Sequence, residues 1–478
     1  MRRLARAHGP VMQLLFGEVP TVVASSPEAA QEVLRRKDLA FADRHLTSAT
    51  EAFSFGGRDV VPAPYGERSR KLLTQELLTA ARVRSFRRVR EVEVARLVRD
   101  VPAAAASGAA VNLTGMGDRL INDIVLRCSV GSRCRHREEY LAALHAMVRQ
   151  TSGLSIADLF PSSKLASMVA MAPRSSLANR KKMERIIEQI IQERKDQMET
   201  DTGGDQAAAV ESNDTSSTTL TRTMAELIRS LRVMTKVQAE LRQAFQGKST
   251  ITEDDIGKLS YFKMVIKESL RLHCLEPFLI PRKCRETSKI MGYNVPKGTS
   301  IFVNMWAICR DSKYWENAKE FMSERFETNN IEFKGNNFEF LPFGSRCRIC
   351  PGINLGLANI ELALANLLYH FDWKLPNGML HKDLDMREAL ELLAAKHTSL
   401  NVCPVSKIAS RRIYQLNNIS KLLDKLVHEE LRHQQQMNRK LSIATAAEEA
   451  KQLSIPCSGM KCPHEQRFHD NLFLYFLV

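Results

Sequence analysis

The stretch Phe343-Gly344-Ser345-Arg346-Cys347-Arg348-Ile349-Cys350-Pro351-Gly352 decides how the rest of the chain is interpreted. Its centre is Cys350, and an apolar, helix-compatible run begins directly after Gly352. A thiolate just before a helix lies near backbone amides and the positive end of the helix dipole, which suits a soft, anionic metal ligand. Arg348, two residues upstream, can pair with an anionic group on whatever the sulfur holds. Taken alone, a single cysteine is more often a buried structural residue.

This stretch resembles the haem-binding loop of the haem-thiolate monooxygenases, the cytochrome P-450 superfamily, whose pattern is Phe-x-x-Gly-x-Arg-x-Cys-x-Gly. The resemblance assigns four residues to haem binding, with the cysteine as the axial ligand of the iron: Phe343, Arg348, Cys350 and Gly352. Position 346 departs from the pattern, because it carries Arg346 where the family has a glycine. A strained backbone at that position would cost on the order of 1–3 kcal/mol.

A second family motif is structural. Glu268 and Arg271 are three residues apart and therefore lie on one helix face, matching the family's Glu-x-x-Arg. Arg325 follows in a segment that resembles the family's Phe-x-Pro-Glu-Arg-Phe, with serine in place of the proline. The resemblance implies a cluster of these three side chains that locks the cradle beneath the haem. By itself, such an ion pair is a common surface feature that contributes a few tenths of a kcal/mol.

The acid and alcohol of the family's central helix match Asp214 and Thr215. The resemblance makes them the catalytic pair that delivers protons to bound oxygen, although the same two residues would also serve as an ordinary helix N-cap. Residues 200–216 otherwise have the composition of a loop, with the helix starting at residue 214, 215 or 216. The first half of the family's central helix and the helix before it have no counterpart upstream, so we expect this helix to be truncated.

Two basic segments could either bind a partner or form an ordinary solvated surface. Arg70 is the candidate for the arginine that reaches a haem propionate in the family, while the Trp that accompanies it there is missing. A solvated basic face is the alternative for the region around Arg70. By resemblance, the side of the fold that docks an acidic flavoprotein, the NADPH-cytochrome reductase, carries a run of arginines: Arg82, Arg84, Arg87, Arg88 and Arg90.

Composition limits the partners. The chain has 478 residues, with 69 basic against 54 acidic side chains and a net charge of +15. Such a surface favours an acidic protein or an anionic membrane. The basic residues are spread along the chain without a motif for base recognition, so we expect no nucleic-acid partner. Ten cysteines without a repeating spacing favour a reducing compartment.

Localisation is predicted from the family. The resemblance implies the endoplasmic reticulum membrane. No run of about eighteen apolar residues is present, and the N-terminal anchor of plant family members has no counterpart here. A peripheral or cytosolic protein is therefore also compatible with the sequence.

The expected fold class is mostly α with small β-sheets, in a cytochrome P-450-like arrangement. Residues 1–409 form the haem-thiolate monooxygenase-like domain, with a gap in the match near residues 200–215. Residues 410–478 form a basic extension that is disordered or partly helical, for which a zinc site is a remote alternative; its candidate ligands would be Cys457, Cys462, His464 and His469. Two short strands are expected within residues 11–24, followed by a helix from Ser26-Pro27 to about Arg36.

The resemblance predicts a function in plant specialised metabolism. The chain would hold haem b and insert one oxygen atom from O2 into a small lipophilic substrate such as a terpenoid, with electrons from the NADPH-dependent reductase. Residues 275–280, together with Ala394 and Ala395, would line the substrate pocket, although a plain core segment has the same composition. The alternative is a catalytically impaired haem-thiolate remnant, or an incomplete gene product that lacks part of the central helix.

Overall fold

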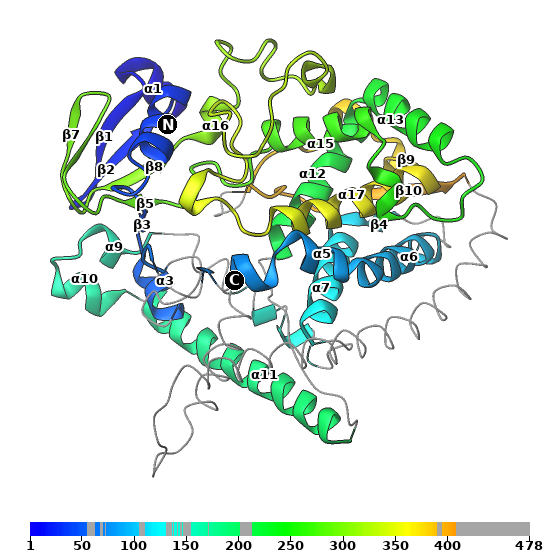
Figure 1. The fold of residues 1–478 in the computed structure, drawn as a ribbon, viewed down its shortest axis with the longest axis horizontal. Helices are drawn as coiled ribbons and strands as arrows, with labels where there is room; N and C mark the ends of the chain where they lie inside the picture. The colour runs from blue at the N-terminus through cyan, green and yellow to red at the C-terminus, as the bar shows by residue number, and fades with distance from the viewer. Residues whose placement is uncertain are drawn as a thin grey trace, which may run out of the picture.

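A computed structural model describes residues 1–54, 63–66, 70–71, 73–104, 110–130, 136, 138–140, 142–143, 146, 154–170, 172–200, 213–389 and 394–407. These residues form a small sheet region that includes the N-terminus and a larger helical region beside it (Figure 1). The fold is thus mostly helical with small sheets, as the sequence predicts. The predicted extension from residue 410 onward lies outside the described residues.

Three small sheets are present among the described residues. The first has the strand order β1-β2-β8-β5-β3, the second β4-β10-β9, and the third pairs β6 with β7. In the first sheet β2 runs parallel to β8, and the other neighbours are antiparallel. The strands are β1 (Val11–Phe16), β2 (Val19–Ala24), β3 (Asp43–Arg44), β4 (Val111–Asn112), β5 (Arg282–Lys283), β6 (Ser288–Ile290), β7 (Tyr293–Val295), β8 (Ser300–Val303), β9 (Phe371–Lys374) and β10 (Asn401–Ser406).

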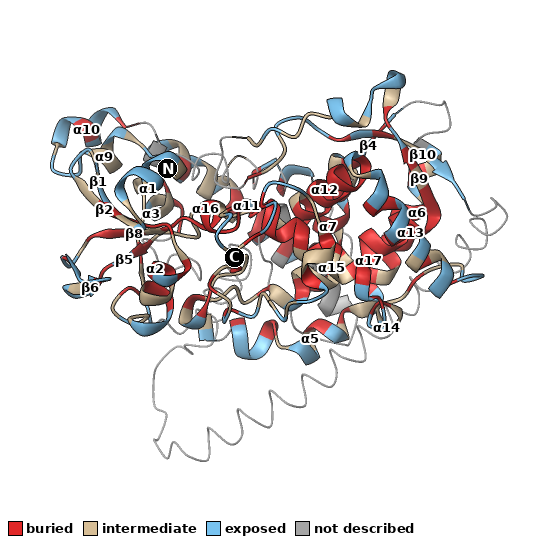
Figure 2. Ribbon diagram, turned by 90° about the horizontal axis from the view of Figure 1, so that it is seen from above, coloured by how far each residue is buried: buried red, intermediate tan, exposed pale blue. Residues whose placement is uncertain are grey.

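The helices pack around a buried centre formed mainly by α12, α7, α15 and α17 (Figure 2). The α-helices are α1 (Arg2–His8), α2 (Pro27–Gln31), α3 (Ser48–Phe53), α5 (Ala80–Ser85), α6 (Arg87–Ala104), α7 (Leu113–Val130), α9 (Ile156–Leu159), α10 (Lys164–Val169), α11 (Ala172–Thr200), α12 (Asn213–Arg229), α13 (Leu231–Ala244), α14 (Glu253–Ile256), α15 (Ser260–Leu272), α16 (Met305–Ile308) and α17 (Ile353–His370). Short π turns follow at Glu32–Arg36 and Leu73–Leu77, and short 3-10 turns at Ser323–Phe326, Arg346–Arg348, Pro376–Gly378 and His381–Asp383.

The N-terminal expectations are confirmed. Strands β1 and β2 form a hairpin, and the Ser26 side chain caps α2 by accepting a hydrogen bond from the Ala29 amide at 3.2 Å. The π turn then extends the helical segment to Arg36. The start of α12 differs slightly from its prediction, because the helix begins at Asn213, before the three capping positions that the sequence suggested. Residues 201–212, which precede it, lie outside the described residues.

The C-terminal end of α17 contains a buried histidine. His370 is 1% exposed, and neither of its ring nitrogens has a hydrogen-bond partner among the described residues. Burial lowers the pKa of His370 to about 4. Below pH 6.5 the His370 imidazole is therefore protonated in the unfolded chain but stays neutral in the folded chain. The free energy of unfolding accordingly decreases as the pH falls toward 4.

We expect the substitution His370→Phe to remove this part of the acid sensitivity, about 3 kcal/mol of unfolding free energy at pH 4. Denaturant unfolding at pH 7 and at pH 4 measures the difference between the substituted and the unsubstituted chain. The matched control is His8→Phe, at an exposed position of α1. Equal acid sensitivity in the two substituted chains would contradict the role given to His370.

Candidate functional site

The cysteine loop, residues 343–352, is a tight turn that leads into α17. The Cys350 amide donates to the Phe343 carbonyl at 2.9 Å, which closes the loop on itself. The Phe343 ring packs edge-on against Phe333 with centroids 5.7 Å apart. Gly352 is the N-cap residue of α17, so Cys350 lies at the positive end of a helix of 18 residues. The loop therefore offers a sulfur in the position that the sequence predicts for a metal ligand.

Position 346 has the backbone conformation that favours glycine. Arg346 has a φ of 55°, and Gly344, two residues earlier, has a φ of 69°. A left-handed conformation costs a residue with a Cβ atom roughly 1–2 kcal/mol. The backbone strain that the sequence predicts at Arg346 therefore corresponds to its positive φ angle.

We expect Arg346→Gly to stabilise the fold by about 0.5–1 kcal/mol, because relief of the left-handed strain is partly offset by the larger conformational entropy of glycine in the unfolded chain. Denaturant unfolding measures the change. Arg346→Ala is the matched control, since it removes the guanidinium but keeps the Cβ atom. If the alanine variant gained as much stability as the glycine variant, the side chain and not the backbone angle would be the source of the strain.

The loop is held from outside by residues far away in sequence. The Asp38 carboxylate accepts the Cys347 amide at 3.1 Å and forms an ion pair with Arg282 at 2.6 Å. The Ser345 hydroxyl donates to the Gly335 carbonyl at 2.6 Å. Gly335 has a φ of 82°, and a Cβ atom there would lie 3.2 Å from the Ser345 Cα atom, so this position favours glycine. These contacts fix the loop between the sheet region and residues 335–345.

Of the predicted cofactor-binding arginines, Arg348 belongs to this loop and Arg70 contacts it. The Arg348 side chain is buried and donates to the carbonyls of Ala42 at 2.7 Å and Ala63 at 2.6 Å. Arg70 donates to the carbonyl of Ile349, the residue before Cys350. This contact shows that Arg70 is not purely solvated, and its role at a haem propionate stays a prediction.

Two further arginines, which the sequence analysis did not single out, lie beside Arg348. Arg44 on β3 and Arg282 on β5 are directly opposite each other in the antiparallel register, and both are buried. Like charges at directly opposed positions destabilise a strand pair. The sequence signal for this pairing is weak, because 238 residues separate the two strands and only the sheet register brings them together.

We call Arg44, Arg70, Arg282 and Arg348 the arginine cluster. Burial, followed by the charge of Arg70 and then that of Arg282, lowers the pKa of Arg348 to about 10. Burial is the largest cause that lowers the pKa of Arg44, and the positive charges of its three neighbours in the cluster act in the same direction. Buried like charges of this kind are relieved by an anion, and guanidinium groups suit carboxylates in particular. The donor set, one soft sulfur beside carboxylate-binding arginines, fits an iron porphyrin with its propionates.

The start of α12 approaches the start of α17. A Cβ atom at Gly356 would lie 3.4 Å from the Ser216 hydroxyl, and the adjacent Thr215 is partly buried. The Thr215 carbonyl accepts from the Thr219 hydroxyl at 2.9 Å inside the helix. The first turn of α12 therefore lies on the same side of the molecule as Cys350. The side chain of Asp214, the other predicted catalytic residue, lies outside what the structure describes.

The predicted Glu-Arg-Arg residues are in contact. Glu268 and Arg271 on α15 are fully buried and form two hydrogen bonds of 2.8 Å, while the Arg325 Nε atom lies 3.1 Å from Glu268. The Met322 amide also donates to Glu268 at 2.8 Å. Arg271 further donates to the carbonyls of Cys309 and Ala318 at 2.6 and 2.8 Å. The group is a buried ion cluster and not the common surface pair that the sequence left open.

The basic run at residues 82–90 is only partly a surface feature. Arg90 is 0% exposed and forms an ion pair with Glu253, and Arg87 pairs with Glu91 at 2.7 Å and with Asp254 at 2.5 Å. Arg84 and Arg88 are exposed. Arg90 therefore contributes to the packing of α6 against α14, and the docking of a reductase on this side of the fold stays a prediction.

The fold and the site can now be compared with known proteins. The sequence pattern of one protein family, described as Cytochrome P450, matches the chain in two pieces, residues 1–210 and 207–402. Among solved structures, a zebrafish cytochrome P450 determined with progesterone superposes with a TM-score of 0.68 over 84% of this chain and 98% of that chain. The two sequences are 21% identical, so this likeness concerns the fold.

Curated relatives are much more similar in sequence. Ent-isokaurene C2/C3-hydroxylase of Oryza sativa subsp. japonica is 58% identical over 451 residues, covering 86% of this chain and 88% of that protein. Ent-cassadiene hydroxylase of the same plant is also 58% identical, over 86% of this chain and 87% of that protein. Zealexin A1 synthase of Zea mays is 50% identical, over 86% of this chain and 88% of its own length. Within the described part of the chain, no helix is long and apolar enough to cross a bilayer.

Proposed function

The chain belongs to the cytochrome P450 family of monooxygenases, and from this premise we propose that it inserts one oxygen atom from O2 into a lipophilic terpenoid. The observation that carries the proposal is the arrangement around Cys350, with its sulfur at the start of α17 and buried arginines beside it. The relatives named above support the substrate class, because their names describe hydroxylases of diterpenes.

We propose that the resident cofactor is haem b, which supplies an iron centre for the activation of O2 when it is bound. Cys350 would hold its iron through the sulfur, with Phe343 and Gly352 shaping the loop around that sulfur. Arg348 and Arg70 would hold the propionates together with Arg44 and Arg282, because these four guanidinium groups are already gathered and partly desolvated. The carboxylates would supply the negative charge that the arginine cluster needs.

Thr215 and Asp214 would hold and move the proton that oxygen activation consumes. The Thr215 hydroxyl is both a donor and an acceptor, and a carboxyl group such as that of Asp214 can give up and take back a proton. Glu268, Arg271 and Arg325 would act on structure only, by holding the segment below the cysteine loop.

Electrons would come from an NADPH-cytochrome reductase, whose acidic surface suits the net charge of +15 on this chain. Arg84 and Arg88 are the exposed members of the basic run. We propose that the protein acts at the endoplasmic reticulum membrane, in contact with lipophilic substrates.

Reconstitution tests this function. The purified holoprotein, a plant reductase and NADPH are incubated with diterpene substrates under 18O2, and the products are analysed by mass spectrometry. The proposal predicts a product that is heavier by one 18O atom and depends on NADPH. Haem-loaded protein that consumes NADPH but oxygenates no terpenoid across the panel would contradict it.

We expect Thr215→Val and Asp214→Asn each to lower product formation by about a hundredfold, because each removes a group that carries a proton. Haem content and the spectrum of the reduced carbon-monoxide complex should be unchanged. Thr218→Val, at a partly buried position on the same helix, is the matched control. If Thr218→Val lost as much activity as Thr215→Val, these losses would report damage to α12 and not proton delivery.

A specific observation favours the second candidate, an impaired remnant or an incomplete gene product. The comparison with ent-isokaurene C2/C3-hydroxylase spans 451 positions but only 86% of this chain, so about 40 positions of that relative have no counterpart here. The two family matches meet at residues 207–210, directly before α12. We propose that the missing positions fall there, in the first half of the central helix. Sequencing the transcript across residues 200–215 tests this. An uninterrupted reading frame with additional codons at that point would show that the natural protein contains the missing part of the helix.

A further inference from the structure

The first turn of α12 is held between two other helices. The Ser217 hydroxyl donates to the Asp118 carboxylate on α7 at 2.5 Å, and Ser217 is only 2% exposed. On another side of the same turn, a Cβ atom at Gly356 of α17 would lie 3.4 Å from the Ser216 hydroxyl. Together the two contacts determine how this turn is rotated about the helix axis.

This rotation determines the direction of Thr215. Successive residues of an α-helix point about 100° apart. With Ser217 bonded to α7 and Ser216 directed to α17, the Thr215 side chain lies on the face of α12 that points away from α7. The hydroxyl that is proposed to move a proton is therefore aimed by the residue two positions after it.

Asp118 is a fixed point for this contact. A Cβ atom at Gly117, its neighbour on α7, would lie 3.6 Å from a methyl group of Leu220, so the two helices approach closely here. Asp118 is partly buried, and the Asn122 side chain donates to its backbone carbonyl at 2.7 Å. A carboxylate near the N-terminal end of a helix also interacts favourably with the helix dipole. Asp118 thus offers α12 both a hydrogen-bond acceptor and a favourable charge.

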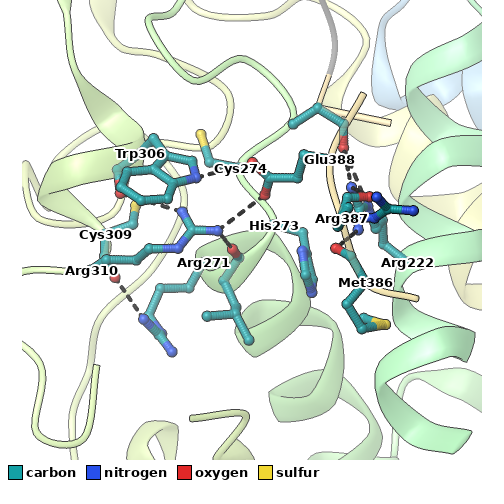
Figure 3. A network of polar contacts seen from close by, with 12 residues as sticks. Arg222, Arg271, His273, Cys274, Trp306, Cys309, Arg310, Met386, Arg387 and Glu388 are labelled. Atoms are coloured by element: carbon teal, nitrogen blue, oxygen red, sulfur yellow. Dashed lines mark hydrogen bonds and ion pairs between the residues drawn. The ribbon is translucent and has the colours of Figure 1, made fainter. Parts of the chain in front are cut away.

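The body of α12 is held by different contacts (Figure 3). Arg222 is 0% exposed and donates to the carbonyls of Met386 and Ala395 at 3.0 and 2.7 Å. Further along the helix, the Glu226 carboxylate lies 2.8 Å from the His273 ring nitrogen Nε2. All of these contacts are C-terminal to Ser217.

The first turn cannot rely on the contacts of the body. Inside α12, the Thr219 hydroxyl donates to the Thr215 carbonyl at 2.9 Å, and the Thr223 hydroxyl donates to the Thr219 carbonyl at 2.7 Å. Hydroxyl groups that bond to the carbonyl four residues earlier often bend a helix and slightly destabilise it. Helix ends also open more readily than helix centres. An anchor at Ser217 therefore has an effect on Thr215 that Arg222 cannot supply.

We propose that Asp118 is a positioning residue, which acts through Ser217 to aim the Thr215 hydroxyl for proton transfer. The inference rests on the proposed function, because that function gives Thr215 its role. The competing role for Asp118 is packing alone, in which it stabilises α7 against α12 without any effect on proton transfer. Two measurements on the same variants separate these roles.

Hydrogen–deuterium exchange of the purified holoprotein, analysed by mass spectrometry, measures the anchor. In a regular helix the amides of residues 217–220 bond to the carbonyls of residues 213–216, so their exchange reports the opening of the first turn. Asp118→Ala and Ser217→Ala should each raise this exchange rate about tenfold, because a hydrogen bond to a charged group is lost. Asp118→Asn should keep most of the protection, because its amide oxygen still accepts from Ser217.

Reconstitution with the reductase, NADPH and the diterpene panel, abietadiene included, measures the consequence for the reaction. Asp118→Ala and Ser217→Ala should each lower kcat about tenfold and leave KM unchanged, because a misdirected hydroxyl delivers protons poorly but does not bind the substrate. Asp118→Asn should restore most of kcat. The matched control is Thr223→Val, which removes a hydroxyl 2.7 Å from that of Ser269 on α15. It should leave both kcat and the exchange at residues 217–220 unchanged.

Unchanged exchange at residues 217–220 in Asp118→Ala would overturn the inference. Faster exchange with an unchanged kcat would also overturn it and leave packing as the role of Asp118, as would an equal fall of kcat in Thr223→Val. If Asp118→Ala does not fold, Ser217→Ala decides, because it loses a single hydroxyl group. An unsubstituted chain that oxygenates no diterpene would contradict the proposed function itself, whereas failure of the inference alone shows only as a lack of difference between variants of an active chain.

Discussion

Glu268→Gln is expected to destabilise the fold by about 3–5 kcal/mol, measured as the free energy of unfolding in denaturant. The substitution removes the negative charge from between Arg271 and Arg325 and leaves two buried guanidinium groups without their shared carboxylate. A loss of this size is a large fraction of the stability of a typical domain. Haem content should fall along with stability.

The chain offers a matched control for this effect. Glu324 precedes Arg325 and forms an ion pair with Arg232 at 2.6 Å, but the Arg232 side chain is 65% exposed. We expect Glu324→Gln to cost less than about 1 kcal/mol, as is usual for pairs at the surface. Similar losses from both substitutions would contradict the view that burial makes the Glu268 cluster essential.

Aromatic packing connects this cluster to the cysteine loop. The guanidinium of Arg271 lies 5.2 Å from the centre of the Trp315 ring. Trp315 packs edge-on against Phe340 at 6.2 Å, and Phe340 lies three residues before the loop begins. A disturbed cluster would therefore shift the residues that lead into Phe343. This is the structural reason to expect haem loss and instability together.

Cys350→Ser is expected to abolish product formation and to eliminate the strongly red-shifted Soret band of the reduced carbon-monoxide complex, because serine cannot supply a thiolate. Cys347→Ser is the control within the same loop. Burial, followed by the hydrogen bond to Asp38, raises the pKa of the Cys347 thiol to about 11, so that sulfur is poorly suited to serve as a thiolate. If the band were lost in Cys347→Ser and kept in Cys350→Ser, the iron ligand would be Cys347 and not Cys350.

The features that the sequence predicts well are local. The cysteine loop, the cap at Ser26 and the strands of residues 11–24 depend on residues close together in the chain, so spacing and turn chemistry suffice to find them. The family match is likewise carried by short motifs around Cys350 and Glu268. These motifs lead to the family, the fold class and the enzyme class, all of which the comparisons support.

The features that the sequence does not reveal depend on distant pairing. Arg44 and Arg282 become neighbours only through the register of β3 and β5. Arg90 is a charged residue of the kind usually found at a surface, yet it is buried and pairs with Glu253. The two residues are 163 positions apart in the chain.

The absorption spectrum of the reduced, carbon-monoxide-bound form of the purified chain tests most directly whether Cys350 is an iron ligand. We expect bound haem with a strongly red-shifted Soret band, because Cys350 would coordinate the iron as a thiolate despite the left-handed backbone at Arg346. Haem with an unshifted band would show that the thiolate does not coordinate. A chain that binds no haem would contradict the monooxygenase function and leave the family membership as the remaining conclusion.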